Sequence, residues 1–197
     1  MKFRLCILAA VKSLLLFRVP FSHGAGVTII THGYAGNVNG WVNGMANQIP
    51  NYTGFPGANS TIHKLTMLYN GSSYFHQWTR LNGSSPTSTD SGEIIVELDW
   101  SDEAGGTSAT YDESTYNVAQ AVTSVLLLTN GISDLGGRPL VEFPIHLIGH
   151  SRGGSLVNEI SRLCHVVFKP VQNPSRVVRD LRRCLSEGNT GLERKRV

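Results

Sequence analysis

The stretch HLIGHSRGG, residues 146–154, constrains the fold of this 197-residue chain more than any other. An apolar run leads into it and apolar residues at helical spacing follow it, so the sequence predicts a turn between a strand and a helix. Gly149 and Gly153 stand two residues before and after Ser151. This G-x-S-x-G pattern is typical of a strained turn that exposes a nucleophilic serine and leaves no room for those two side chains. A glycine-rich turn without a catalytic role is the alternative.

Apolar, β-branched runs predict three short strands of a mainly parallel sheet, at residues 27–30, 93–100 and 143–149. Between the second and third, residues 112–131 predict a helix, because four apolar residues recur there at helical spacing: Val118, Val122, Val125 and Leu126. Strand, helix and strand in this order predict an α/β fold. By contrast, the segment 51–92 is rich in Asn, Gly, Ser and Thr. We expect it to be an excursion outside the sheet, despite the candidate strand KLTMLY within it.

A serine needs a base to take its proton and hydrogen-bond donors to stabilise the oxyanion that it forms. In a G-x-S-x-G turn one donor is the main-chain N–H of the residue after the serine, here Arg152, and the other comes from the loop after an earlier strand. The glycine-containing loop after residue 31 fits that position, with Gly33 as its loop glycine and the N–H of Tyr34 as the donor. His32 is expected to hold this loop by hydrogen bonding, and His150 is expected to pack beside the serine without acting as its base.

Four segments resemble the α/β-hydrolase superfamily in their order and spacing, and they look most like its lipases of pancreatic-lipase type: THGYAGNVNGW, ELDWSDEAG, YNVAQAVTSVLLL and IHLIGHSRGG. The resemblance covers roughly residues 26–164. It implies a core domain over that range and a serine hydrolase of lipase or carboxylesterase type that acts through an acyl-serine intermediate. It also implies Ser151 as the nucleophile, a small-molecule or lipid ester as the substrate, and no cofactor or metal.

The rest of the catalytic triad is missing from the expected places. In this superfamily an acid and then a histidine follow the serine along the chain. Only 46 residues follow Ser151, and His165 is the one histidine among them. A 14-residue helical rise would hold His165 ~21 Å from Ser151. Asp99 and Asp102 are expected to be caps and loop anchors. We therefore expect an incomplete α/β-hydrolase fold, or else a non-catalytic binding protein or pseudoenzyme.

The two ends of the chain differ from its middle. Residues 164–197 carry eight basic and three acidic residues, whereas residues 19–163 carry five and eleven. We expect 165–197 to be a basic tail that results from truncation or a frameshift after Leu163; a native basic surface helix is the alternative. No aromatic platform accompanies its arginines, so a nucleic-acid partner is not expected.

Residues 1–25 combine basic residues, an apolar stretch and small residues, which predicts a signal peptide and a secreted protein. Lys12 interrupts the apolar stretch, so no transmembrane segment is expected, and an ordinary N-terminal element of a cytoplasmic domain remains the alternative. The three cysteines, Cys6, Cys164 and Cys184, match no zinc spacing and leave a Cys164–Cys184 disulfide open.

Overall fold

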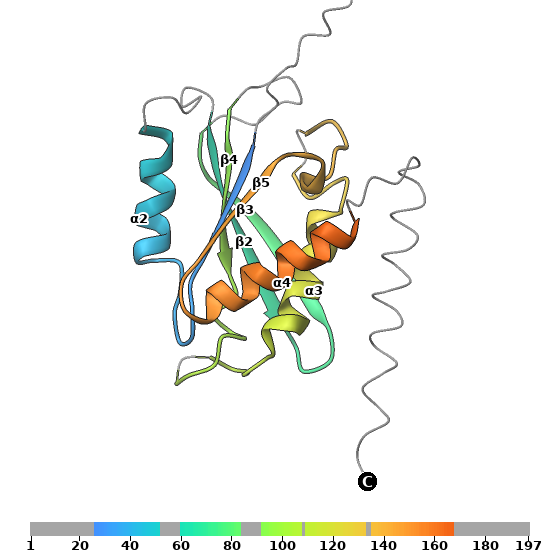
Figure 1. The fold of residues 1–197 in the computed structure, drawn as a ribbon. Coiled ribbons are helices and arrows are strands. Elements are labelled where there is room, and N and C mark those ends of the chain that lie inside the picture. The colour runs from blue at the N-terminus through green and yellow to red at the C-terminus, as the bar shows by residue number, and fades with distance from the viewer. Residues whose placement is uncertain (1–25, 52–59, 84–91, 108, 133–134, 168–197) are drawn as a thin grey trace, which may run out of the picture.

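The structure is a computed structural model, and five segments of it are described: residues 26–51, 60–83, 92–107, 109–132 and 135–167. The candidate signal peptide, residues 1–25, lies outside them, as do residues 168–197 of the basic tail. The described residues form an α/β structure, with a sheet in the middle and helices on both faces (Figure 1). This confirms the expected α/β layout with a mainly parallel sheet.

The sheet has five strands in the order β3-β2-β4-β1-β5. The pairs β2/β4, β4/β1 and β1/β5 are parallel, and only β2/β3 is antiparallel. In chain order the strands are β1 (Val27–Thr31), β2 (Thr61–Tyr69), β3 (Tyr74–Asn82), β4 (Ile94–Asp99) and β5 (Ile145–Gly149).

β1 and β4 lie at the centre of the sheet and are buried along their whole length. Their sequences, VTIIT and IIVELD, are the near-continuous apolar runs that a strand covered on both faces needs. Their parallel register pairs Thr31 with Leu98, and Thr31 also pairs with Gly149 of β5. The loops after β1, β4 and β5 therefore begin at one edge of the sheet, its carboxyl edge.

Each face of the sheet has its own apolar core. On one face, α2 (Trp41–Gln48) buries Val42 and Ala46 against Ile30 and Ile95. On the other face, α3 (Thr115–Leu126) and α4 (Arg152–Val167) pack against each other and against the strands (Figure 1). Two short 3-10 helices complete the described elements, η1 (Ile49–Asn51) and η4 (Leu140–Glu142).

The helix predicted between the second and third strands is confirmed as α3. Its side chains at the four predicted apolar positions are all buried: Val118, Val122, Val125 and Leu126. The helix begins after Ser114, whose side chain accepts a hydrogen bond from the N–H of Asn117 (3.1 Å). Such a cap satisfies one of the free N–H groups of the first turn. The observed helix is shorter than the 112–131 pattern, because residues before Ser114 pair with the loop after β4.

The expectation that residues 51–92 form an excursion outside the sheet is wrong. They supply two strands, and β2 pairs along its length with the central strand β4. β2 alternates between buried and less buried positions, whereas β3 is mostly exposed. An edge strand with one neighbour and a solvated face carries polar residues, and its sequence therefore lacks an apolar run.

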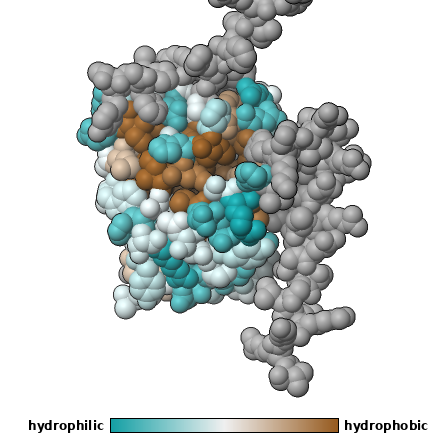
Figure 2. All heavy atoms as spheres, viewed as in Figure 1, coloured by the Kyte–Doolittle hydropathy of each residue, from teal (hydrophilic) through white to brown (hydrophobic). Residues whose placement is uncertain are grey.

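β5 forms the other end of the described sheet. Apolar side chains gather on the face along which β5 runs (Figure 2), and its residues Ile145, Leu147 and Ile148 are only half-buried. Within the described residues, one side of the β5 ladder has no partner strand. None of the described helices is long and apolar enough to cross a membrane.

Candidate active site

Ser151 lies in the turn between β5 and α4, at the carboxyl edge of the sheet. Its backbone has φ = 55°, in the left-handed region, and its side chain is exposed. Among the described non-glycine residues only Ala35 shares a positive φ. A left-handed non-glycine residue costs free energy, and such residues concentrate at functional sites. The predicted strand-to-helix turn thus has the backbone strain expected of a nucleophile elbow.

The glycines on either side of Ser151 are required by main-chain contacts. A Cβ atom on Gly149 would overlap the carbonyl group of Gly153, and a Cβ atom on Gly153 would overlap the carbonyl oxygen of His32. In contrast, a Cβ atom on Gly154 would lie 3.7 Å from the nearest carbonyl oxygen, an ordinary contact. The sequence-based prediction that the turn leaves no room for side chains at Gly149 and Gly153 is confirmed.

The loop after β1 packs against this turn. A Cβ atom on Gly33 would come within 2.7 Å of the carbonyl oxygen of His150 and 2.9 Å of Ser151 Cβ. Gly33 therefore lets the two loops approach each other closely. The next residue, Tyr34, exposes 58% of its surface beside the serine loop, and Ala35 turns the chain with φ = 52°.

Two main-chain N–H groups near the serine are free to donate. Within the described residues, the N–H of Tyr34 makes no hydrogen bond. The N–H of Arg152 likewise has none, since Arg152 is the first residue of α4 and the first turn of a helix leaves its N–H groups without intrahelical partners. A helix N-terminus also favours negative charge. These are the two donors that the sequence assigned to an oxyanion.

The side chain of Arg152 ties the serine turn to the loop after β4. Its guanidinium donates to the carbonyl oxygens of Ala104 (2.8 Å) and Glu113 (2.5 Å) and to Asp112 Oδ1 (2.5 Å). It also lies over the Trp100 ring, 5.6 Å from the ring centroid. The sequence assigned a role to the main chain of Arg152 alone and missed this contact set.

The loop after β4 also contacts Tyr34, whose N–H is the other expected donor. Gly105 and Gly106 both have positive φ. A Cβ atom on Gly105 would lie 2.8 Å from Tyr34 Cε2 and 3.0 Å from Arg152 Nη1, and one on Gly106 would lie 2.5 Å from Ala35 Cβ. The loop after β4 thus supports both Tyr34 and Arg152.

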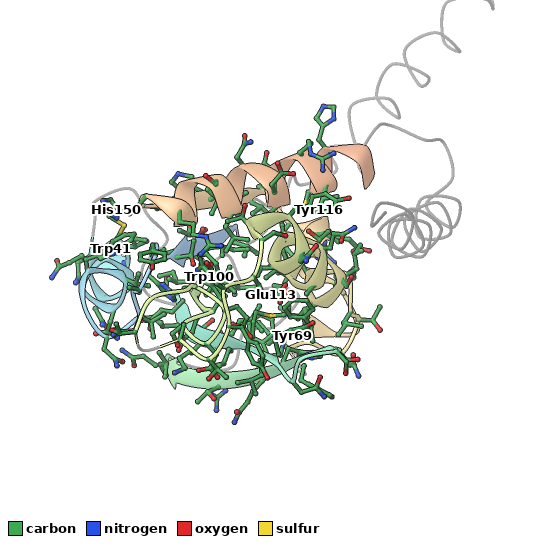
Figure 3. All side chains as sticks on the ribbon, turned by 90° about the horizontal axis from the view of Figure 1, so that it is seen from below. Trp41, Tyr69, Trp100, Glu113, Tyr116 and His150 are labelled. Atoms are coloured by element: carbon green, nitrogen blue, oxygen red, sulfur yellow. The ribbon has the colours of Figure 1, made fainter. Side chains whose placement is uncertain are left out.

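Seen from below, His150 and Trp41 lie together at one side, Glu113 and Tyr69 lie at another, and Trp100 lies between them (Figure 3).

Replacing Arg152 by glutamine should lower the free energy of unfolding by about 1–3 kcal/mol, since two carbonyl oxygens lose their charged donor. Urea unfolding measures this effect through the midpoint and slope. Arg162→Gln on the same helix is the matched control, because Arg162 donates to no main-chain carbonyl oxygen among the described residues. It makes an exposed pair with Glu159 (2.9 Å), worth under about 1 kcal/mol, and lies over the exposed Tyr116 ring. Equal destabilisation by the two substitutions would contradict the role given to Arg152.

His32 is buried and holds the loop after β1. Its Nδ1 lies 3.0 Å from the Gly33 carbonyl oxygen, and the N–H of Trp100 donates to its Nε2 (3.3 Å). The ring also stacks on the Trp100 side chain. The structural role expected of His32 agrees with these contacts. The prediction that His150 packs beside the serine is only partly correct: the side chain is exposed, and it meets the Trp41 ring edge-on at 6.1 Å.

Asp99 ends β4 and acts as an anchor, as the sequence predicts. Its carboxylate pairs with Lys64 (3.1 Å) and accepts a hydrogen bond from the N–H of Ser101 (3.2 Å). Burial alone would raise the pKa of Asp99, but interactions with the His32 ring, Ser101 and Lys64 together hold it well below its usual range. Asp102 accepts a main-chain hydrogen bond from Tyr111 (2.8 Å), which closes the same loop.

A base for Ser151 is not found among the described residues, since none of their histidines hydrogen-bonds to the Ser151 hydroxyl. His165 lies in the last turn of α4, beside the residues that precede and begin β5. Ser151 follows the opposite end of β5, so the predicted separation of the two residues agrees with the structure. Within the described part of the chain, no group of three or more His, Cys, Asp or Glu residues could hold a metal ion.

Comparisons with known proteins leave the family of this chain open. No protein-family model, no curated protein and no solved structure matches it.

Proposed function

We propose that the chain is a serine hydrolase of lipase or carboxylesterase type with an incomplete α/β-hydrolase fold. Ser151 is the nucleophile, and the N–H groups of Tyr34 and Arg152 stabilise the oxyanion. The substrate is a small-molecule or lipid ester, and the reaction needs no cofactor or metal. If residues 1–25 are a signal peptide, the protein is secreted.

One observation carries this proposal: a left-handed serine sits at the carboxyl edge of the sheet, close to two N–H groups that make no hydrogen bond within the described residues, one in the loop after β1 and one at the start of α4. A structural turn has no need of an exposed serine in a strained conformation. Gly33 brings the loop of Tyr34 against Ser151, and Arg152 opens a helix whose N-terminus favours negative charge. The arrangement suits a reaction in which an oxyanion forms on an atom bonded to the serine oxygen.

In the proposed reaction, Ser151 Oγ attacks the ester carbonyl carbon while a base takes the hydroxyl proton. The carbonyl oxygen becomes an oxyanion that accepts hydrogen bonds from the N–H groups of Tyr34 and Arg152. The bond from the carbonyl carbon to the alcohol oxygen then breaks, and the alcohol leaves with the proton. Water attacks the acyl-serine in the same way and releases the carboxylic acid.

A second candidate is a non-catalytic binding protein or pseudoenzyme that keeps the serine turn. The observation that favours it is that, in the described part of the chain, no histidine hydrogen-bonds to the Ser151 hydroxyl. A serine hydroxyl without a base stays protonated at neutral pH and is a poor nucleophile. The two candidates differ in the reactivity of Ser151.

A fluorophosphonate probe separates the two candidates. We expect covalent labelling of the 197-residue protein that is lost in Ser151→Ala, with mass spectrometry locating the adduct. Ser155→Ala is the matched control, because Ser155 is an exposed serine one turn further along α4, and its loss should leave labelling unchanged. Absence of labelling in protein with a cooperative unfolding transition would overturn the hydrolase and favour the pseudoenzyme.

A further inference from the structure

One edge of the sheet is open to pairing with another strand. β5 is an end strand, and within the described residues its outer side has no partner (Figure 1). Between Ile145 and Gly149 it contains no lysine, arginine or proline, and its ladder with β1 is regular. The end strand at the other side, β3, carries Arg80, and its pairing with β2 is irregular at Ile62/His63. Charged residues and bulges protect edge strands from pairing with other chains, so β5 is the less protected edge.

The outer side of β5 presents main-chain groups in a regular pattern. On the inner side, the N–H of Val27 in β1 donates to the carbonyl oxygen of Pro144 (2.8 Å). Main-chain groups of successive strand residues point to alternate sides, so His146 and Ile148 also direct theirs toward β1. Three residues therefore direct their N–H and C=O groups toward the open side: Ile145, Leu147 and Gly149.

This pattern is symmetric about Leu147. A second copy whose β5 runs antiparallel would place Leu147 opposite Leu147 and Ile145 opposite Gly149, with a two-fold axis between the two leucines. Each of the three outward-facing residues would then exchange hydrogen bonds with its opposite residue, about six in all. His146 would lie opposite Ile148, so the two histidines would not oppose each other.

A groove between β5 and α4 lies beside this edge. Its volume is about 360 Å³, and Leu147 and Val157 contribute apolar side chains to it. The other α4 residues that line the groove have short side chains: Gly154, Asn158 and Ser161. Short side chains at a contact let two helices lie close together. The groove therefore leaves room beside α4 for the same helix of a second copy.

The charge of this surface favours a second copy over the basic end of the chain. A second groove of about 420 Å³ continues past Ile145. Apart from histidines, the described residues that line the two grooves include one charged side chain, Glu142, which pairs with Arg138 (3.2 Å). A neutral surface can meet its own copy without like-charge repulsion. Residues 168–197 carry eight basic and three acidic residues, which would gain little from a surface with a single, already paired carboxylate.

We propose that two copies of this chain form a two-fold dimer through β5. The two β5 strands pair antiparallel with Leu147 at the axis, and the two five-stranded sheets become one continuous sheet. The α4 helices of the two copies lie side by side on one face of it. This association does not depend on the chemistry of Ser151, and fluorophosphonate labelling is read separately.

Asn158 is the α4 residue expected closest to the axis. Gly154 lies beside Gly149 at one end of β5, since a Cβ atom on Gly154 would be 3.7 Å from the Gly149 carbonyl oxygen. Ser161 lies at the other end, where it lines the second groove together with Ile145. Asn158 lies midway between them on the same side of α4, and it is exposed. A charge at this position would therefore meet the same charge of the other copy.

Sedimentation velocity of the 197-residue protein from ~1 to ~200 µM tests the dimer. A five-residue ladder with shallow grooves is a small interface, so we expect reversible association with a dissociation constant on the order of micromolar. Asn158→Glu and Asn158→Lys should each weaken association about tenfold or more, and an equimolar mixture of the two should restore it. Ser155→Glu is the matched control, because Ser155 is exposed on α4 and lines neither groove, and it should associate as the parent does.

Amide hydrogen exchange of the parent, followed by NMR at the two ends of this concentration range, locates the interface. The outward N–H groups of Ile145, Leu147 and Gly149 should gain protection as the concentration rises. Those of His146 and Ile148, which face β1, should be protected at both concentrations. Circular dichroism establishes that each variant is folded.

A parent that stays monomeric up to ~200 µM would overturn the proposal. If the Leu147 N–H were then protected at every concentration, other residues of the same chain would cover the edge. A dimer that both Asn158 variants form as strongly as the parent, with protection gained outside β5, would overturn it as well.

Discussion

Gly153→Ala should destabilise the protein by about 3 kcal/mol or more, at the upper end of what overpacking produces. The new methyl group would overlap the carbonyl oxygen of His32 and lie 3.1 Å from that of Thr31. Both atoms belong to the main chain at the end of β1, so no flexible side chain can move aside. Relief requires α4 to move away from β1, which separates the loop of Tyr34 from Ser151. Urea unfolding should show the loss of stability, and fluorophosphonate labelling should fall with it.

Gly154→Ala is the matched control, since it adds the same methyl group to the next residue of α4. At that position the nearest atom would be the Gly149 carbonyl oxygen at 3.7 Å, and the backbone is helical. Alanine is a better helix former than glycine by up to about 1 kcal/mol. We therefore expect equal or higher stability. A similar loss in both variants would mean that the close approach of α4 to β1 does not constrain the fold.

The sequence predicts the centre of this fold better than its edges. β1 and β4 are covered on both faces, so burial alone dictates an apolar run that is visible in the sequence. β3 is an edge strand whose side chains are mostly exposed, and its sequence YFHQWTRLN has no such run. Its position is set by pairing with β2, a contact that the local pattern does not encode. Residues 51–92 were misassigned because an edge strand, unlike a central strand, does not need an apolar run.

The serine turn was predictable because it requires glycine at two fixed positions, and these glycines can be recognised in the sequence. The contacts of the Arg152 side chain were not, because two of its three acceptors are main-chain carbonyl oxygens, which any residue supplies. A cleft of about 500 Å³ between the β2–β3 hairpin and α3 could not be predicted for another reason. Three residues that line it, Asn117, Gln120 and Ser124, are ordinary polar residues of a solvated helix face until the hairpin is placed opposite them.

Glu103 is a buried carboxylic acid in the loop that Arg152 holds. Its side chain is fully buried, and neither carboxyl oxygen has a hydrogen-bond partner among the described residues. Its main chain is fixed by hydrogen bonds to Trp100 and Glu113. Burial, together with the negative charge of Asp102 and smaller effects of Asp99 and Glu113, raises the pKa of Glu103 from 4.5 to about 7. Folding therefore favours the protonated form.

The stability of the parent protein should consequently contain a component that is lost as the pH rises. Below pH 4.5, Glu103 is protonated in both the folded and the unfolded protein, and its contribution to the free energy of unfolding is complete. Above pH 4.5, Glu103 ionises first in the unfolded chain, so this contribution falls as the pH rises and is lost as the pH passes through about 7. The loss amounts to about 3 kcal/mol, at 1.36 kcal/mol for each pH unit between the two pKa values. Urea unfolding at several pH values from 4 to 8.5 measures it.

Other groups also make the stability depend on pH: burial raises the pKa of Glu97, and the pKa of Asp99 is lowered. The substitution Glu103→Gln separates the contribution of Glu103 from theirs. Glutamine keeps the shape of the side chain and carries no charge at any pH. The variant should match the parent near pH 4 and exceed it in stability by about 3 kcal/mol near pH 8.5. Glu142→Gln, at an exposed glutamate paired with Arg138, should leave the pH profile unchanged. If Glu103→Gln and the parent gave parallel profiles across this range, Glu103 would be ionised in the folded protein and the loop would have to supply it with a partner.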